Sequence, residues 1–214
     1  MKKYIFILSI VLLFSCSTTK QQKGMGITSI PAENNLTKVE SDIVNEFLDI
    51  ELKKERYKRY KDYEIVIIEE ALKKMKSINV YLYSLDEWNT MNKMNKSEDV
   101  KNMYFLDTIQ IKKIKNNLKD EEVYHWKVAD FKKIKISLFK YEELIKTTNT
   151  GEYLKKKLII YLSKPLVIDE NNIFISFEIG NGDLGFSSIT HFTVLMRKIN
   201  NKWVESGFYE DGVF

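Results

Sequence analysis

Few residues in this chain combine a type and a spacing that chemistry would require. Gly180, Gly182 and Gly185 fit the pattern G-x-G-x-x-G, which brings a pyrophosphate to the backbone when a strand precedes it and a helix follows. The residues after Gly185 are mostly β-branched, aromatic or aliphatic, which favours a strand. We therefore predict a hairpin loop at these glycines, a strand from Thr190 to Ile199, and no nucleotide cofactor.

The two histidines, His125 and His191, are weak candidates for a site. Zinc usually takes three or four protein ligands, and neither histidine has a second ligand at a typical spacing. A Ser–His–Asp triad would need His191 together with Ser187 or Ser188 and Asp183, but residues so close on one loop do not normally converge. We therefore assign no catalytic residue and no metal ligand.

Adjacent carboxylates occur at four places in the chain. They are Glu69-Glu70, Glu121-Glu122, Glu142-Glu143 and Glu210-Asp211. Neighbouring residues on a helix point in different directions, so these pairs indicate solvated faces and lend no support to a glycosidase pair. Aromatic residues gather near the C-terminus, where they are expected to seal a sheet core; they are Trp203, Phe208, Tyr209 and Phe214.

The segment Glu51–Lys61 (ELKKERYKRYK) alternates basic and aromatic residues. Such a pattern can bind nucleic acid or an anionic polymer. It also fits an amphipathic helix with Tyr57 and Tyr60 packed inward, which we favour. The net charge of the chain is +4, and near +2 without Lys2 and Lys3. That charge is too small to predict a nucleic-acid partner.

The only cysteine, Cys16, follows a distinctive N-terminal segment. Lys2 and Lys3 precede an apolar run from Tyr4 to Phe14 that only Ser9 interrupts. A basic start, an apolar run and a small residue together are typical of a secretory signal peptide. The run has about 11 residues, whereas a membrane-spanning helix needs roughly 20. Because there is one cysteine, a disulfide within the chain is excluded.

Leu13-Phe14-Ser15-Cys16 resembles the lipobox of bacterial lipoproteins, with leucine three residues before the cysteine and a small residue one before it. The resemblance implies diacylglycerol on the Cys16 sulfur, cleavage before Cys16, and acylation of the new N-terminus with a fatty acid such as palmitate. One acyl chain binds a membrane only marginally, whereas two or three hold a protein firmly. Residues 1–15 are therefore expected to be a signal peptide and the mature protein to be lipid-anchored in the cell envelope.

Residues 16–36 are polar or rich in turn-forming residues and lack apolar periodicity, so we expect a flexible tether. Ser17 stands where lipoproteins of enteric bacteria carry aspartate when they stay in the inner membrane. The resemblance therefore implies the outer membrane, with the protein facing the periplasm. Residues 37–214 are enough to bury one core and are expected to form a single domain.

The first half of this domain has helical periodicity. Thr37 and Glu40 form a capping box, which predicts a helix from Lys38. Further helices are expected over Tyr63 to Ser77, over Ser84 to Trp88, and after Asp107 as a cap, with a loop over Asn92 to Asn102. The run Ile65–Ile68 is also strand-like.

After about Lys132 the period changes to two. Strands are expected at Ile134–Leu138, Leu158–Leu162, Ile173–Ile179, Thr190–Ile199 and Lys202–Tyr209, with turns at Asp169–Asn172 and Asn200-Asn201. This order predicts an α+β fold in which N-terminal helices pack on a C-terminal antiparallel β-meander. The part from Ser163-Lys164-Pro165 to Asn-Asn-Lys-Trp at 200–203 resembles the C-terminal part of small uncharacterised Gram-negative lipoproteins.

The sequence thus favours a membrane-anchored binding or interaction module, with an envelope protein or a glycan as its partner. Two alternatives stay open: an envelope hydrolase acting on cell-wall or glycan material, and an immunity-type protein that neutralises a toxin. A deep cleft holding two carboxylates or a histidine pair would favour the hydrolase. A shallow apolar or charged surface would favour binding.

The lipid anchor predicts the effect of one substitution. Cys16→Ala removes the sulfur that would carry diacylglycerol, so we expect neither lipid attachment nor signal processing. Metabolic labelling with an alkyne fatty acid should mark the wild-type protein and leave the variant unmarked. Equal labelling of both proteins would exclude lipidation at Cys16.

Overall fold

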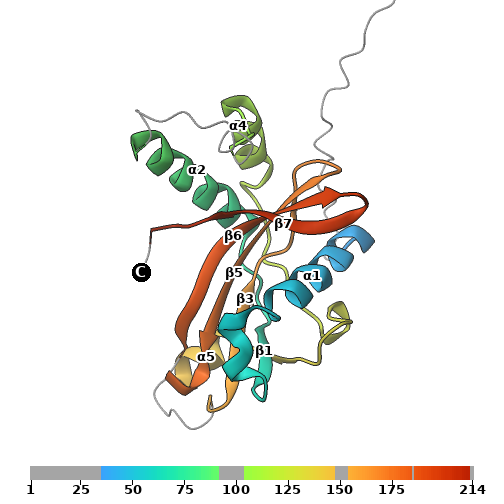
Figure 1. Cartoon of the computed structure of the whole chain (residues 1–214), viewed down its shortest axis with the longest axis vertical. Coiled ribbons are helices and arrows are strands. Elements are labelled where there is room, and N and C mark those ends of the chain that lie inside the picture. The colour runs from blue at the N-terminus through green and yellow to red at the C-terminus, as the bar shows by residue number, and fades with distance from the viewer. Residues whose placement is uncertain (1–34, 92–103, 148–153, 185, 213–214) are drawn as a thin grey trace, which may run out of the picture.

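The computed structural model describes residues 35–91, 104–147, 154–184 and 186–212, which adopt the predicted α+β architecture (Figure 1). The helices are α1 (Lys38–Glu51), η1 (Glu55–Tyr60), α2 (Lys74–Met91), α4 (Thr108–Asn117), η2 (Val128–Asp130), α5 (Tyr141–Thr147) and η3 (Gly182–Leu184), of which η1, η2 and η3 are 3₁₀-helices. The strands are β1 (Glu64–Ile68), β2 (Ser137–Phe139), β3 (Lys157–Leu162), β4 (Leu166–Val167), β5 (Asn172–Asn181), β6 (Ser187–Ile199) and β7 (Lys202–Tyr209).

These strands form one seven-stranded sheet in the order β2-β1-β3-β5-β6-β7, with β4 paired to β5. The predicted meander is present, because β5, β6 and β7 pair antiparallel in sequence order. Asn200 and Asn201 have φ angles of 50° and 60°, the left-handed conformation that a tight two-residue hairpin requires. At the other edge β1 pairs parallel with both β2 and β3, which the sequence did not predict.

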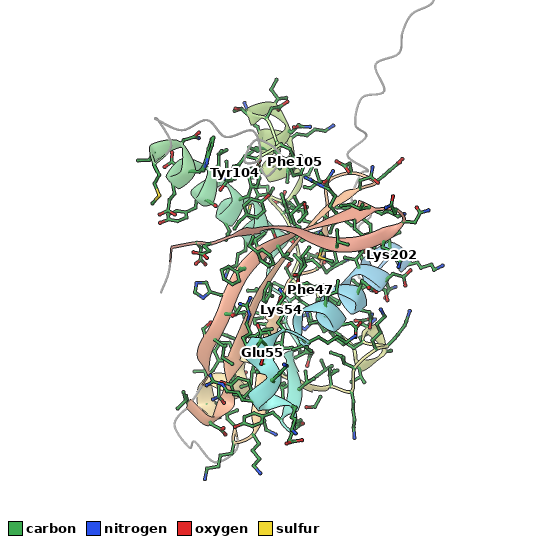
Figure 2. The ribbon with its side chains drawn as sticks, viewed as in Figure 1. Phe47, Lys54, Glu55, Tyr104, Phe105 and Lys202 are labelled. Atoms are coloured by element: carbon green, nitrogen blue, oxygen red, sulfur yellow. The ribbon has the colours of Figure 1, made fainter. Side chains whose placement is uncertain are left out.

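Helices cover both faces of the sheet (Figure 1). On one face, Ile175 and Phe177 of β5 join a core with α1, whose Phe47 points toward the sheet (Figure 2) and lies 4.9 Å from the Phe177 ring. On the opposite face, Phe174 packs with Tyr81 of α2 in a second core that α4 completes. A third core lies under α5 over β1 and β3. The two ends of this second face are therefore covered by separate helices.

Two of the predicted helix starts are confirmed. The Thr37 hydroxyl accepts from the backbone N–H of Glu40 at 3.2 Å, and the Glu40 carboxylate accepts from the Thr37 N–H at 2.8 Å. This is a reciprocal capping box at the start of α1. Asp107 and Gln110 form the same arrangement at the start of α4.

The predicted helix from Tyr63 to Ser77 is wrong. Residues Glu64–Ile68 form β1, and α2 begins only at Lys74. Four consecutive β-branched aliphatic residues suit a strand buried on both faces, and β1 is enclosed between two parallel partners from far along the chain. The isoleucines of β1 also have the spacing of one face of a helix, which explains why a helix was predicted.

Two further boundaries differ from those expected. Ser84 and Glu87 do not begin a helix, because both lie inside α2, where the Ser84 hydroxyl bonds the Tyr104 hydroxyl at 2.7 Å. The strand expected at Ile134–Leu138 is confined to Ser137–Phe139, while Ile134 packs against the α1 core outside any strand. The loop expected over Asn92 to Asn102 lies outside the described residues.

The segment before β2 is attached to α1 by one buried side chain. The Asn45 amide donates to the carbonyls of Ser41 and Asp130, both at 2.8 Å. Its oxygen accepts from the N–H groups of Lys132 at 2.6 Å and Lys133 at 3.2 Å. Buried polar groups that lose their partners are costly, so Asn45 holds this segment where β2 can pair with β1.

We expect Asn45→Ala to lower the free energy of unfolding by about 2–3 kcal/mol, because it leaves several backbone groups without partners. Urea denaturation followed by circular dichroism measures this change. Asn116→Ala, on the exposed side of α4, is the matched control and should change stability by about 0.5 kcal/mol or less. Equal changes in the two variants would contradict the role given to Asn45.

Candidate functional site

An open groove of about 620 Å³ lies on the sheet face that carries α2 and α5. Its lining comes from four segments: the connection from β1 to α2, residues 123–125, α5 and β3. Val123, Tyr141 and Ile145 line it and are 37%, 43% and 54% exposed. Three large, partly exposed apolar side chains are thus gathered in one hollow with a few polar groups, which makes it the candidate binding site.

Backbone hydrogen bonds hold the connection that forms one wall of the groove. The Glu69 N–H donates to the Phe139 carbonyl at 2.8 Å, and the Leu72 N–H donates to the Leu162 carbonyl at 3.0 Å. The Ala71 N–H donates to the Tyr124 carbonyl at 2.8 Å. This wall is therefore fastened to both neighbouring strands before any ligand arrives.

Two stacked tyrosines form the aromatic part of the lining. The rings of Tyr141 and Tyr161 lie 5.6 Å apart with 27° between their planes. Burial raises the pKa of Tyr161, and nearby Tyr141, Glu178 and Glu70 raise it further. Tyr161 is therefore a neutral phenol at neutral pH, with carboxylates close by.

The carboxylates of the groove already have partners. Glu70 accepts from the Tyr141 N–H at 2.8 Å and so orients the first turn of α5. Glu142 forms an ion pair with Lys146 at 2.5 Å. Just outside, Glu69 lies 3.3 Å from Nδ1 of His125. These contacts position side chains and leave no carboxylate pair arranged for acid–base catalysis among the described lining residues.

A polar row continues from the groove across the sheet. Tyr161 on β3 is the register partner of Glu178 on β5, which is the partner of His191 on β6. Glu178 forms an ion pair with Lys76 of α2. Nε2 of His191 lies 3.0 Å from an Asp211 carboxylate oxygen. These partly exposed polar side chains therefore lie on the same sheet face as the groove, beyond its lining.

The glycine-rich pattern forms a hairpin, as predicted, with β6 following it. A Cβ on Gly182 would lie 2.1 Å from the Leu154 carbonyl oxygen, so close backbone approach explains this glycine. The Asp183 carboxylate accepts from the Tyr63 hydroxyl and, at 2.7 Å, from the Lys156 N–H. This loop serves the packing of β3, and Gly185 lies outside the described residues.

The other residues considered as sites are dispersed. His191 pairs with Asp211, whereas Asp183 is held by Tyr63 and Lys156. His191 and Asp183 therefore contact different partners and do not contact each other in these interactions. Of the carboxylate pairs, Glu121 caps α2 by accepting from the N–H groups of Lys74 and Met75 at 2.8 and 3.2 Å.

The C-terminal aromatic residues are divided between core and surface. Tyr209 is fully buried, 5.2 Å from the Tyr81 ring and 5.8 Å from that of Tyr104, which Figure 2 labels beside α2. Trp203 packs against the α1 core, and Phe208 is 39% exposed. The prediction of core packing holds for Tyr209; Phe214 lies outside the described residues.

The segment Glu51–Lys61 packs Tyr57 and Tyr60 inward, as predicted. It is not one amphipathic helix, because α1 ends at Glu51 and a 3₁₀-helix starts at Glu55. The break follows from a buried cluster: fully buried Glu51 accepts from the Tyr57 hydroxyl at 2.8 Å and from Lys54. Lys54 also lies 2.8 Å from the Glu205 carboxylate on β7.

Most of the groove was missed by sequence reasoning. In the sequence Glu70, His125 and Glu142 belong to other patterns, and no site pattern includes Tyr141 or Tyr161. Each segment contributes one or two ordinary residues, and only the parallel pairing of β1 brings them together.

Comparisons with protein-family models, with curated proteins and with solved structures find no match. Within the described ranges, no three histidine, cysteine, aspartate or glutamate side chains gather into a metal-binding group. None of the helices in the described part of the chain is both long and apolar enough to cross a membrane.

The buried cluster predicts a pH dependence of stability. Burial raises the pKa of Glu205, Lys54 opposes this rise, and Glu51 adds to it. The folded state therefore favours protonated Glu205. That stability is fully present below the unfolded pKa of about 4.3 and is lost as pH rises through the raised folded pKa.

Glu205→Gln imitates the protonated form, so we expect its melting temperature to exceed that of the wild type at pH 8 but not at pH 4. Differential scanning calorimetry across this range measures the difference. Glu55→Gln, whose side chain is 81% exposed, is the control and should follow the wild type at every pH. If the difference in melting temperature between Glu205→Gln and the wild type stays the same from pH 4 to pH 8, the prediction is wrong.

Proposed function

We propose that this protein is a lipid-anchored binding module of the cell envelope, held through Cys16 on the outer membrane and facing the periplasm. Its domain would bind an envelope component in the groove between α5 and the connection from β1 to α2. The observation that carries this proposal is the gathering of Val123, Tyr141 and Ile145, all exposed, around Tyr161 in one hollow. Apolar and aromatic lining with a few polar groups is typical of ligand sites.

The contacts that the groove carboxylates already make support binding over hydrolysis. Glu70 and Glu142 are engaged by the Tyr141 N–H and by Lys146. A glycosidase places one acid and one carboxylate on opposite sides of the bond that breaks. Glu70 instead orients the first turn of α5 and its tyrosine through the Tyr141 N–H, which lowers the entropy lost on binding.

Site-specific photocrosslinking in the bacterium that produces the protein tests this proposal. A photoreactive residue replacing Tyr141 should form one defined adduct with an envelope component. The same residue replacing Tyr83 is the control, since Tyr83 is equally exposed at 42% but lies on α2 outside the groove lining.

Adding Tyr161→Ala should remove the adduct formed at position 141, because it removes the ring on which Tyr141 stacks. An adduct that persists in this variant, or one that also forms at position 83, would contradict binding in the groove. Release of shortened envelope glycan by the purified protein would instead favour the hydrolase.

A further inference from the structure

The polar groups of the groove include both donors and acceptors that have no partner within the described part of the chain. The hydroxyls of Tyr141 and Tyr161 form no hydrogen bond to any described residue, and the Lys73 ammonium has no ion-pair partner there. Glu70 uses only Oε2, to accept from the Tyr141 N–H. A ligand that both donates and accepts hydrogen bonds would satisfy all four groups.

The charges of the groove balance. Glu142 is neutralised by Lys146 in an ion pair. This leaves Glu70 and Lys73 as one negative and one positive lining group. A cationic ligand would meet Lys73 and an anionic ligand would meet Glu70, so like-charge contacts oppose both. An uncharged ligand meets neither penalty.

The tyrosine pair supplies the apolar complement. The Tyr141 ring is stacked on Tyr161 and is 43% exposed, so it offers apolar surface at little conformational cost. A pyranose ring has the matching form, with apolar C–H groups on its faces and hydroxyls around its edge. The hydroxyls would reach Glu70 and Lys73 while one face packs on the aromatic surface.

Polar side chains beyond the groove, on the same sheet face, indicate a chain rather than a single sugar. Tyr161 is followed across the sheet by Glu178 and then His191, in register and partly exposed. Glu178 and His191 lie beyond the lining of the hollow of about 620 Å³, where they pair with Lys76 and Asp211. A linear oligosaccharide could follow the row from β3 to β6.

We propose that the groove binds an uncharged glycan chain, with one sugar packed against Tyr141 and Tyr161 and hydrogen-bonded by Glu70 and Lys73. This inference rests on the proposed function and names the class of ligand for the same site. No bond is made or broken.

Titration calorimetry with chitohexaose in its fully N-acetylated, uncharged form as the probe tests the inference. The full chain is kept in a detergent that lacks a sugar head group, so that the detergent does not compete. We expect saturable binding of chitohexaose and at least tenfold weaker binding of hexalysine and of hexagalacturonate. Tyr141→Ala should weaken binding of chitohexaose at least tenfold, and Glu70→Gln about threefold to tenfold.

Tyr83→Ala, on α2, is the matched control and should bind chitohexaose as the wild type does. Tyr161→Phe keeps the stacked ring and removes only the hydroxyl, so it tests that residue without risk to folding; we expect a weakening of twofold or more. Unchanged binding by Tyr141→Ala, or preference for either charged probe, would overturn the inference.

The same measurements separate this inference from the proposed function. If none of the three probes binds while the crosslink at position 141 still depends on Tyr161, the groove is a binding site but its ligand is not an uncharged glycan. If that crosslink is also absent, both proposals fail.

Discussion

The structure depends on the need to bury both faces of one sheet. In β5 every residue from Ile173 to Phe177 is buried, including Ser176, so side chains on both sides must be covered. Ser176 meets this constraint through hydrogen bonds of 2.7 Å with Ser77 of α2 and Thr193 of β6. A buried hydroxyl without such partners would cost about 1–3 kcal/mol, so this contact also fixes where α2 lies on the sheet.

The helices cover the two faces of the sheet unequally, and this difference accounts for the groove. One face carries α1 and a single large core. The opposite face carries two smaller cores, one under α2 and α4 and the other under α5. Between them the side chains of Tyr161, Glu178 and His191 stay partly exposed. The groove therefore lies where the helices over these two cores leave part of the sheet uncovered.

The groups around the groove mainly hold neighbouring side chains in position and are not arranged for a reaction. Glu70 orients α5, and α5 presents Tyr141 to Tyr161. Each contact restricts a side chain that would otherwise lose entropy on binding. Lys54 and Glu205 on the other face have the opposite character, because with fully buried Glu51 they join the end of α1 to β7. The charged groups at the groove therefore orient surface side chains, whereas Lys54 and Glu205 connect elements of the fold.

The sequence by itself determined the elements whose signals are local. The helix caps at Thr37 and Asp107, the strands of the C-terminal meander and the Asn200-Asn201 turn depend on neighbours within a few residues, and they formed as expected. The alternating run at Ile134–Leu138 formed a strand only from Ser137. The lipobox at Cys16 is likewise a local pattern, and it remains a prediction. Tertiary structure decided β1, because its apolar run satisfies a helical and a strand pattern equally and only pairing with β2 and β3 distinguishes them. It also decided the groove, because Tyr141 and Tyr161 become neighbours only when that parallel pairing sets α5 against β3; contacts between distant segments leave no periodic signal in the chain.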